Sequence, residues 1–135
     1  MRNRIGLAFL LIWFSAIAFA ADYTYERNVS YRGNTEDEYA SKMCRLDIAY
    51  QPGVKNVPVV VWFHGGGLTG GSREVPTQLL TDDMVVVGVE YRLSPHVKTT
   101  DIVDDATAAI AWVFDHIGKY GGSTSSIYIA GHSAG

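Results

Sequence analysis

The chain has 135 residues, with 11 Lys and Arg against 14 Asp and Glu, a formal net charge of −3 and one cysteine. A mildly acidic chain without a basic patch argues against nucleic acid as a partner, and a single cysteine excludes an internal disulfide. The sequence shows no repeat, no low-complexity tract and no internal linker, as expected of a chain without an internal domain boundary.

The first twenty residues resemble an export signal. Arg2 and Arg4 precede an apolar run over residues 5–14, and Ala18-Phe19-Ala20 fits a small-x-small cleavage site. An uncleaved anchor is the alternative, because residues 5–21 form an uncharged stretch of 17 residues, at the lower limit for spanning a bilayer. Cleavage is favoured, and it leaves 9 basic and 14 acidic residues, a charge of −5, with no stable membrane span. The expected location is therefore periplasmic or extracellular.

The first half of the mature chain carries weak strand signals. Residues 23–29 favour a strand or an ordered arm, and residues 34–41 read as a charged connection. Apolar and polar residues then alternate over residues 44–50, the pattern of a strand with one buried face. Cys44 is interpreted as a small apolar side chain on that strand.

Two continuous apolar runs, residues 57–63 and 84–89, predict parallel strands covered on both faces. Residues 72–80 between them form a modest helix candidate. A further short strand is expected at residues 127–130, after a turn-rich segment over residues 121–125.

The clearest helix is expected from Asp101 to about Gly118, where apolar residues recur at spacings of three and four. Thr100 or Asp101 can cap its start, and Asp104 and Asp105 are read as charges that favour the positive end of the helix dipole. Alternating strands and helices predict an α/β fold, a mostly parallel sheet with helices on both faces. Ligands bind such sheets at the carboxyl ends of the strands.

Two glycine motifs lie at those ends. His64-Gly65-Gly66-Gly67 follows the strand 57–63, and a glycine run there lets backbone N–H groups converge on an oxyanion. Gly131-His132-Ser133-Ala134-Gly135 follows the strand 127–130 and has the Gly-x-Ser-x-Gly pattern that presents a nucleophilic serine on a sharp turn. The two motifs in this order are a much stronger signal than either alone.

These motifs, with Val89-Glu-Tyr-Arg-Leu-Ser-Pro95 between them, resemble the α/β-hydrolase superfamily, in particular its esterase and lipase branch related to hormone-sensitive lipase. The resemblance covers roughly Met43 to Gly135. It implies that Ser133 is the nucleophile and that the N–H groups of Gly66, Gly67 and Ala134 form the oxyanion hole. The family usually has Asp at position 90 and Ala at position 94, where this chain has Glu and Ser; neither change touches the reacting atoms.

The remaining polar residues are given supporting roles. His64 and Gly65 are expected to hold the glycine loop, while His96, His116 and His132 are poor candidates for the base of Ser133. Glu90, Tyr91 and Arg92 are interpreted as a strand-end brace. No spacing matches a metal site or a nucleotide-binding loop, so neither a metal nor a cofactor is expected.

The function that the resemblance implies is hydrolysis of carboxylic esters, small or carbohydrate-linked, through an acyl-enzyme on Ser133. An amidase or peptidase of the same fold, or a non-catalytic binding module, remains open. The superfamily order of serine, acid and histidine places both triad partners beyond residue 135. We therefore expect residues 1–20 to be a signal peptide and residues 21–135 to be the N-terminal part of one α/β-hydrolase domain, inactive by itself.

Overall fold

The computed structural model describes residues 22–81 and 83–135; the expected export signal lies outside these ranges. The elements are β1 (Thr24–Ser30), α1 (Glu38–Met43), β2 (Arg45–Tyr50), β3 (Val57–Phe63), the 3-10 helix η1 (Thr77–Leu79), β4 (Val85–Val89), α2 (Thr99–His116), the 3-10 helix η2 (Ile117–Tyr120) and β5 (Gly122–Gly131). No helix in the described ranges is both long and apolar enough to cross a bilayer.

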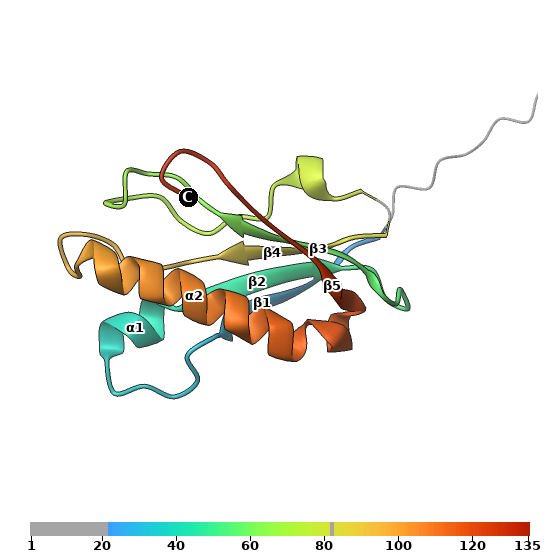
Figure 1. Ribbon diagram of the computed structural model, residues 1–135, viewed down its shortest axis with the longest axis horizontal. Coiled ribbons are helices and arrows are strands. Elements are labelled where there is room, and N and C mark those ends of the chain that lie inside the picture. The colour runs from blue at the N-terminus through green and yellow to red at the C-terminus, as the bar shows by residue number, and fades with distance from the viewer. Residues whose placement is uncertain (1–21, 82) are drawn as a thin grey trace, which may run out of the picture.

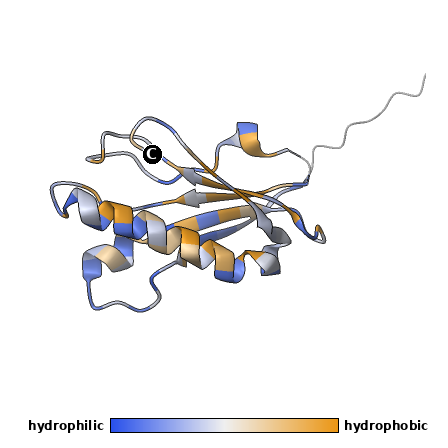
Figure 2. Ribbon diagram, viewed as in Figure 1, coloured by the Kyte–Doolittle hydropathy of each residue, from blue (hydrophilic) through white to orange (hydrophobic). Residues whose placement is uncertain are grey.

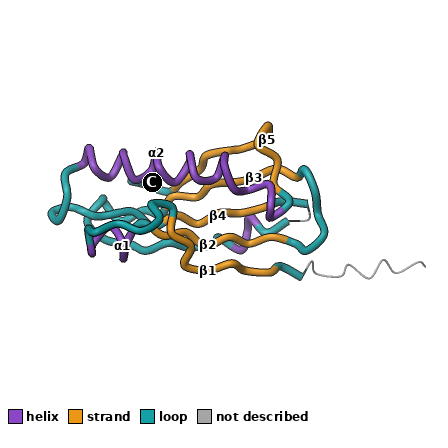
Figure 3. The backbone as a smooth tube through the Cα atoms, turned by 90° about the horizontal axis from the view of Figure 1, so that it is seen from below, coloured by secondary structure: helices purple, strands orange, loops and turns teal. Residues whose placement is uncertain are grey.

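One five-stranded sheet organises the molecule, in the order β1-β2-β4-β3-β5 (Figure 3). The strands β4, β3 and β5 run parallel, and β2 and β1 extend the sheet antiparallel beyond β4. The predicted α/β class is confirmed. The antiparallel arm arises because β1 and β2 precede the first crossover and are joined through the short helix α1, whereas the parallel strands need long connections.

The core lies between the sheet and the helices α1 and α2, which cover the same face (Figure 1). Alternate residues of β3 and β4 point to this face and meet the apolar stripe of α2, and Figure 2 shows how hydrophobic residues concentrate in the central strands. The fully buried members from these three elements are Val59, Val61, Val85, Val87, Val89, Ala109 and Val113. The strands predicted over residues 57–63 and 84–89 are therefore confirmed as β3 and β4, and the predicted long helix is confirmed as α2. The helix begins earlier than expected, at Thr99 with Lys98 as its N-cap, so Thr100 and Asp101 lie in its first turn instead of capping it.

The opposite face of the sheet is covered by the connection between β3 and β4. This connection contains the short 3-10 helix η1 instead of the longer helix predicted over residues 72–80. Pro76 has extended backbone angles, φ −61° and ψ 121°, and a proline also restricts the residue before it, so a helix cannot run through this point. Trp62 on this face donates from its indole N–H to Glu74 at 3.2 Å.

Gly88 in β4 lets the connection approach the sheet this closely, because a Cβ there would overlap the Glu74 carbonyl oxygen. We expect Gly88→Ala to lower the free energy of unfolding of the complete gene product by about 1–3 kcal/mol. Gly118→Ala is the control, since a Cβ at Gly118 meets no atom within 4 Å and needs no unusual backbone angle. Chemical denaturation of both variants is the measurement, and equal stabilities would refute this packing.

Two expectations about the connecting segments need correction. The supposed charged connection over residues 34–41 contains α1, whose start is capped by Asp37 accepting from the N–H groups of Tyr39 and Ala40. β5 begins at Gly122, inside the expected turn, because the absence of a Cβ there lets the chain pass against β3 and η2.

The alternating segment over residues 44–50 is buried on both faces, not on one. Asp47 and Ala49 on the supposed exposed face have exposed fractions of 8% and 0%. The cause is the covering connection described above, whose Arg73 pairs with Asp47 at 3.0 Å. Cys44 directly precedes β2 and is fully buried, and burial raises the pKa of its thiol.

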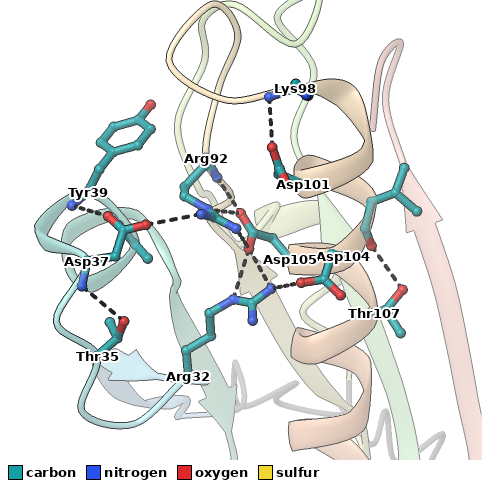
Figure 4. Close-up of polar contacts among 12 residues, drawn as sticks. Arg32, Thr35, Asp37, Tyr39, Arg92, Lys98, Asp101, Asp104, Asp105 and Thr107 are labelled. Atoms are coloured by element: carbon teal, nitrogen blue, oxygen red, sulfur yellow. Dashed lines mark hydrogen bonds and ion pairs between the residues drawn. The ribbon is translucent and has the colours of Figure 1, made fainter.

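Asp105 is a buried ion-pair partner instead of an exposed charge at a helix start. Its side chain is fully buried and accepts from Arg92 and Arg32, while Arg32 also pairs with Asp104 and Arg92 with Asp37 (Figure 4). Burial alone would raise the pKa of Asp105, but the two guanidinium groups outweigh it and hold the pKa below its ordinary value. The cluster ties α2 to the segment after β1 and to α1.

Candidate active site

The three parallel strands end level with one another. Phe63 is paired with Val89 in β4 and with Gly131 in β5, so the segments that follow these residues emerge at one edge of the sheet. The register therefore brings the glycine loop, Glu90-Tyr91-Arg92 and the Ser133 turn into one place. Figure 1 shows the C-terminal turn beside the loop after β3 at this edge.

Ser133 lies at the top of a sharp turn in a left-handed conformation, with φ 56°. A left-handed serine is uncommon, and such strain concentrates at functional sites. The turn is closed by the Gly135 N–H, which donates to the His132 carbonyl at 3.0 Å, and it is tied to β3 by the His132 N–H, which donates to the Phe63 carbonyl at 3.2 Å.

Both outer glycines of the motif are required by close approaches of the backbone. A Cβ at Gly131 would overlap the backbone of Gly135, and a Cβ at Gly135 would overlap the Phe63 carbonyl oxygen. The turn can therefore fold back on itself and sit on the end of β3 only with glycine at both positions. This is the physical reason for the Gly-x-Ser-x-Gly pattern in this chain.

The glycine loop lies directly against the nucleophile turn. A Cβ built at Gly65 would be 2.7 Å from the His132 carbonyl oxygen and 3.2 Å from the Ser133 Cβ. The absence of a side chain at Gly65 thus lets the loop touch the turn. Two segments far apart in the sequence, both singled out by their glycines, meet beside the Ser133 side chain.

The next residues of the loop take backbone angles that favour glycine. Gly66, Gly67 and Leu68 have φ values of 131°, 63° and 62°. The Gly66 carbonyl accepts from the N–H groups of Thr69 and Gly70 at 3.2 and 3.1 Å, which closes a turn. Accordingly, the Gly66 carbonyl is engaged within the loop. The predicted oxyanion donors, Gly66 and Gly67 in the loop and Ala134 after Ser133, lie on the two segments that meet.

His64 is buried at the base of the loop, with an exposed fraction of 2%. Its Nε2 is 2.8 Å from a Glu90 carboxylate oxygen and its Nδ1 is 2.8 Å from the Gly65 carbonyl oxygen. Tyr91 stacks on the imidazole, with ring centroids 4.4 Å apart, and donates its hydroxyl to the His64 carbonyl. Burial alone would lower the pKa of His64, but its hydrogen bonds to Glu90 and Gly65 outweigh it and raise the pKa.

No histidine in the described part of the chain is placed as a base for Ser133. His96, which the sequence left without a partner, packs against the Tyr39 ring at 5.0 Å, and His116 stacks on Trp112 at 4.4 Å. His132 is adjacent to Ser133 and its ring lies against Gly65. The described residues also hold no cluster of three or more His, Cys, Asp or Glu side chains that could bind a metal ion.

An apolar hollow of about 290 Å³ borders the turn on the α2 side of the sheet. Phe63, Ile110, Ile129 and Ala134 are among its lining residues. Ile129 in β5 is 61% exposed, so this side of the strand is open in the described structure.

Sequence reasoning missed the part that Arg73 plays at this edge. Its backbone N–H donates to Glu90 at 3.0 Å, and its guanidinium bridges to Asp47 at 3.0 Å and Asn28 at 3.2 Å. No signal in the sequence marks Arg73, because its partners come from three other segments. The proximity of Glu90 to His64 could have been inferred, since both residues directly follow neighbouring parallel strands.

Several known proteins with similar sequences are named carboxylesterases or esterases. The BD-FAE family model matches residues 46–135. Carboxylesterase NlhH from Mycobacterium tuberculosis is 34% identical over 116 residues, which cover 82% of this chain and 34% of that protein. Liver carboxylesterase B-1 from Rattus norvegicus is 40% identical over 91 residues, 58% of this chain and 16% of that protein. The chain thus spans only about a third of the length of the first relative and 16% of the second.

Solved esterase structures share the fold. An inhibited esterase B from Lactobacillus rhamnosis superposes with a TM-score of 0.71 and 25% identity, covering 84% of this chain and 37% of that chain. A hyperthermophilic esterase from the archaeon Pyrobaculum calidifontis has a TM-score of 0.57 and 37% identity over 67% of this chain and 32% of that chain. The described residues therefore have the architecture of the corresponding part of an α/β-hydrolase.

Proposed function

Because the chain belongs to the BD-FAE family, we propose that the protein hydrolyses carboxylic esters through an acyl-enzyme on Ser133. The observation that carries the proposal is the left-handed Ser133 at the end of β5, with the glycine loop packed against it. A binding module would not need a strained serine beside a loop of this shape. The names of the relatives favour an ester over an amide or peptide bond.

In the proposed reaction, the Ser133 hydroxyl oxygen attacks the acyl carbon while a base takes its proton. The oxyanion that forms accepts hydrogen bonds from the N–H groups of Gly66, Gly67 and Ala134. The alcohol leaves with a proton, and water then releases the acid from Ser133. Because none of the described histidines faces Ser133, the proposed reaction requires a base from outside the described residues.

We assign small acyl esters, free or carbohydrate-linked, as the substrate class. We also propose that the protein is exported after cleavage behind Ala20, as the N-terminal sequence pattern suggests. N-terminal sequencing of the protein recovered outside the cytoplasm is expected to start at Ala21 or Asp22. An intact Met1 on the exported protein would instead support an anchor.

The proposed nucleophile is tested by labelling the complete gene product with a fluorophosphonate probe and mapping the modified peptide. The adduct is expected on Ser133, together with hydrolysis of a short-chain p-nitrophenyl ester. Ser125→Ala is the matched control, because Ser125 is an exposed serine of β5 whose hydroxyl contacts that of Ser123 at 2.9 Å. An adduct on another serine would overturn the assignment.

The 135-residue polypeptide expressed by itself is expected to show no ester hydrolysis and to self-associate. Ser133 has no base among the described residues, and an unassisted serine is a weak nucleophile. β5 is an edge strand of the described sheet, with Tyr128 60% and Ile129 61% exposed, and such an edge invites intermolecular pairing. A monomeric polypeptide with hydrolysis that depends on Ser133 would contradict both expectations; light scattering and an ester assay decide it.

A further inference from the structure

The glycine loop over residues 64–73 has little internal structure to fix its shape. Gly66, Gly67 and Gly71 have φ values of 131°, 63° and 90°, and glycine loses more conformational freedom on folding than any other residue. Apart from the turn at the Gly66 carbonyl, the loop has no regular hydrogen-bond ladder. The Leu68 carbonyl in its middle accepts from the Ser94 N–H at 2.8 Å, and the segments on either side of this bond depend on contacts at the two ends of the loop.

One buried carboxylate holds both ends. The first oxygen of Glu90 bonds the His64 side chain at the start of the loop, at 2.8 Å. The second accepts from the backbone N–H of Arg73 at its end, at 3.0 Å. Glu90 is only 7% exposed, so these hydrogen bonds compete little with water.

Glu90 is itself rigidly placed. Its backbone N–H donates to the Arg45 carbonyl at 2.8 Å, and its carbonyl accepts from the Tyr31 hydroxyl at 2.8 Å. The residue is thus fixed to β2 and to the segment after β1 before its side chain reaches the loop. An anchor held in this way can transmit a fixed position to the groups that it binds.

The contacts of His64 assign it a positive charge. Both ring nitrogens face acceptors, the Glu90 carboxylate and the Gly65 carbonyl, so both must carry a hydrogen. The charge-assisted bond to Glu90 is the stronger kind. A second cation, the Arg73 guanidinium, lies 4.0 Å from the other Glu90 oxygen and is shared with Asp47. The buried carboxylate is therefore compensated from both sides.

We propose that Glu90 is the positioning residue of the glycine loop, whose carboxylate joins His64 to Arg73 and thereby aims the Gly66 and Gly67 N–H groups. The expected effect on turnover rests on the proposed function, whereas the expected restraint on the loop is independent of it. The family that the chain resembles usually has Asp at this position, with a side chain one methylene shorter than that of Glu90.

The first test compares Glu90→Leu with wild type in the complete gene product. Loss of the restraint should lower kcat for a p-nitrophenyl ester by roughly 10- to 100-fold, with KM changed by less than about 3-fold, because misaimed donors fail mainly in the transition state. Hydrogen exchange of residues 64–73 should rise. Asp105→Asn is the control: it weakens a buried carboxylate that touches no loop residue, and should leave kcat and loop exchange unchanged.

The Glu90→Gln variant removes the negative charge but can keep hydrogen bonds to both ends of the loop. It is also the test to use if Glu90→Leu does not fold. At about pH 8 a neutral His64 can accept from the new amide while the amide oxygen keeps the Arg73 N–H, so kcat should stay within about 3-fold. Losing the carboxylate lowers the pKa of His64 in the variant, because burial opposes the charge and Glu90 no longer favours it. As the pH falls, wild-type His64 therefore gains the proton that its bond to Glu90 requires, whereas the variant imidazole stays neutral over a wider pH range and keeps the same bond to the amide. The ratio of wild-type to variant kcat should therefore rise as the pH falls.

The other titratable groups around His64 do not predict this change. Tyr91 stacks on the ring, and burial raises the pKa of its hydroxyl. Glu74 favours the charged form of His64 in both proteins, and the Arg73 guanidinium is present in both. Because both proteins have the same catalytic base, its titration affects both kcat values equally and does not change their ratio.

The outcomes separate the two proposals. A wild-type protein without esterase activity and without a Ser133 adduct contradicts the proposed function alone; loop exchange in Glu90→Leu still decides the restraint. An active wild type with unchanged kcat and unchanged loop exchange in Glu90→Leu overturns the positioning role. If only Glu90→Gln folds, a ratio that does not change with pH overturns it.

Discussion

The Ser133→Ala variant is expected to lower kcat for an acyl ester by about four to six orders of magnitude, the usual effect of deleting the nucleophile of a serine hydrolase. Alanine keeps the Cβ of serine, so the left-handed backbone at φ 56° carries the same steric strain in both proteins. The hydroxyl oxygen is the only atom removed. The loss should therefore be chemical, with little change in the free energy of unfolding.

Steady-state kinetics on a p-nitrophenyl ester and thermal unfolding of both proteins are the measurements. Residual turnover should not exceed the rate supported by the remaining oxyanion donors and by substrate binding. A variant that keeps more than about one per cent of wild-type kcat, with an unchanged unfolding temperature, would show that Ser133 is not the nucleophile.

The strands β3 and β4 and the helix α2 could be predicted because each has a single, regular hydrophobic pattern. β3 and β4 are continuously apolar, since both of their faces are covered, and α2 has a regular stripe that packs on one of those faces. These local patterns agree with the tertiary environment, so the sequence alone suffices for them.

The sequence-based predictions are wrong where contacts between residues far apart in the sequence determine the structure. β5 extends back to Gly122 because the side chains of Val59 and Ile117 occupy the space that a side chain at position 122 would need. Asp105 is buried because Arg32 and Arg92, from other segments, pair with it. Neither contact produces a periodic pattern in the sequence. By contrast, the start of α1 had a readable signal, since Asp37 is a favourable capping residue.

For the candidate site, too, the sequence predicts some features and misses others. The motifs around Ser133 and Gly66 could be found from their residue types, and their convergence could be expected from the carboxyl ends of parallel strands. How closely they approach depends on the register of β3 with β5 and on the absence of a side chain at Gly65. The two-ended contact of Glu90 needs the folded loop and has no local signature.

Gly66→Ala should reduce kcat by about 100- to 1,000-fold while KM changes by only a few fold. A Cβ at Gly66 would overlap the Gly70 carbonyl, and φ 131° is rarely adopted by a residue with a side chain, so the loop must move. The N–H groups that move are needed chiefly when the oxyanion forms, and losing one such donor typically costs this much. Steady-state kinetics and fluorophosphonate labelling rates report the change.

Two further glycine variants make this result specific. Gly67→Ala should cost less, because its Cβ would meet nothing closer than the Thr69 hydroxyl at 3.9 Å, although φ 63° still disfavours alanine. Gly53→Ala has a comparable left-handed angle, φ 88°, in open surroundings, so it should lower stability by about 1 kcal/mol without lowering kcat. If all three variants kept wild-type kcat, the oxyanion hole would have to lie elsewhere; if Gly53→Ala lost as much as Gly66→Ala, backbone strain in general, and not the aim of the loop donors, would explain the effect.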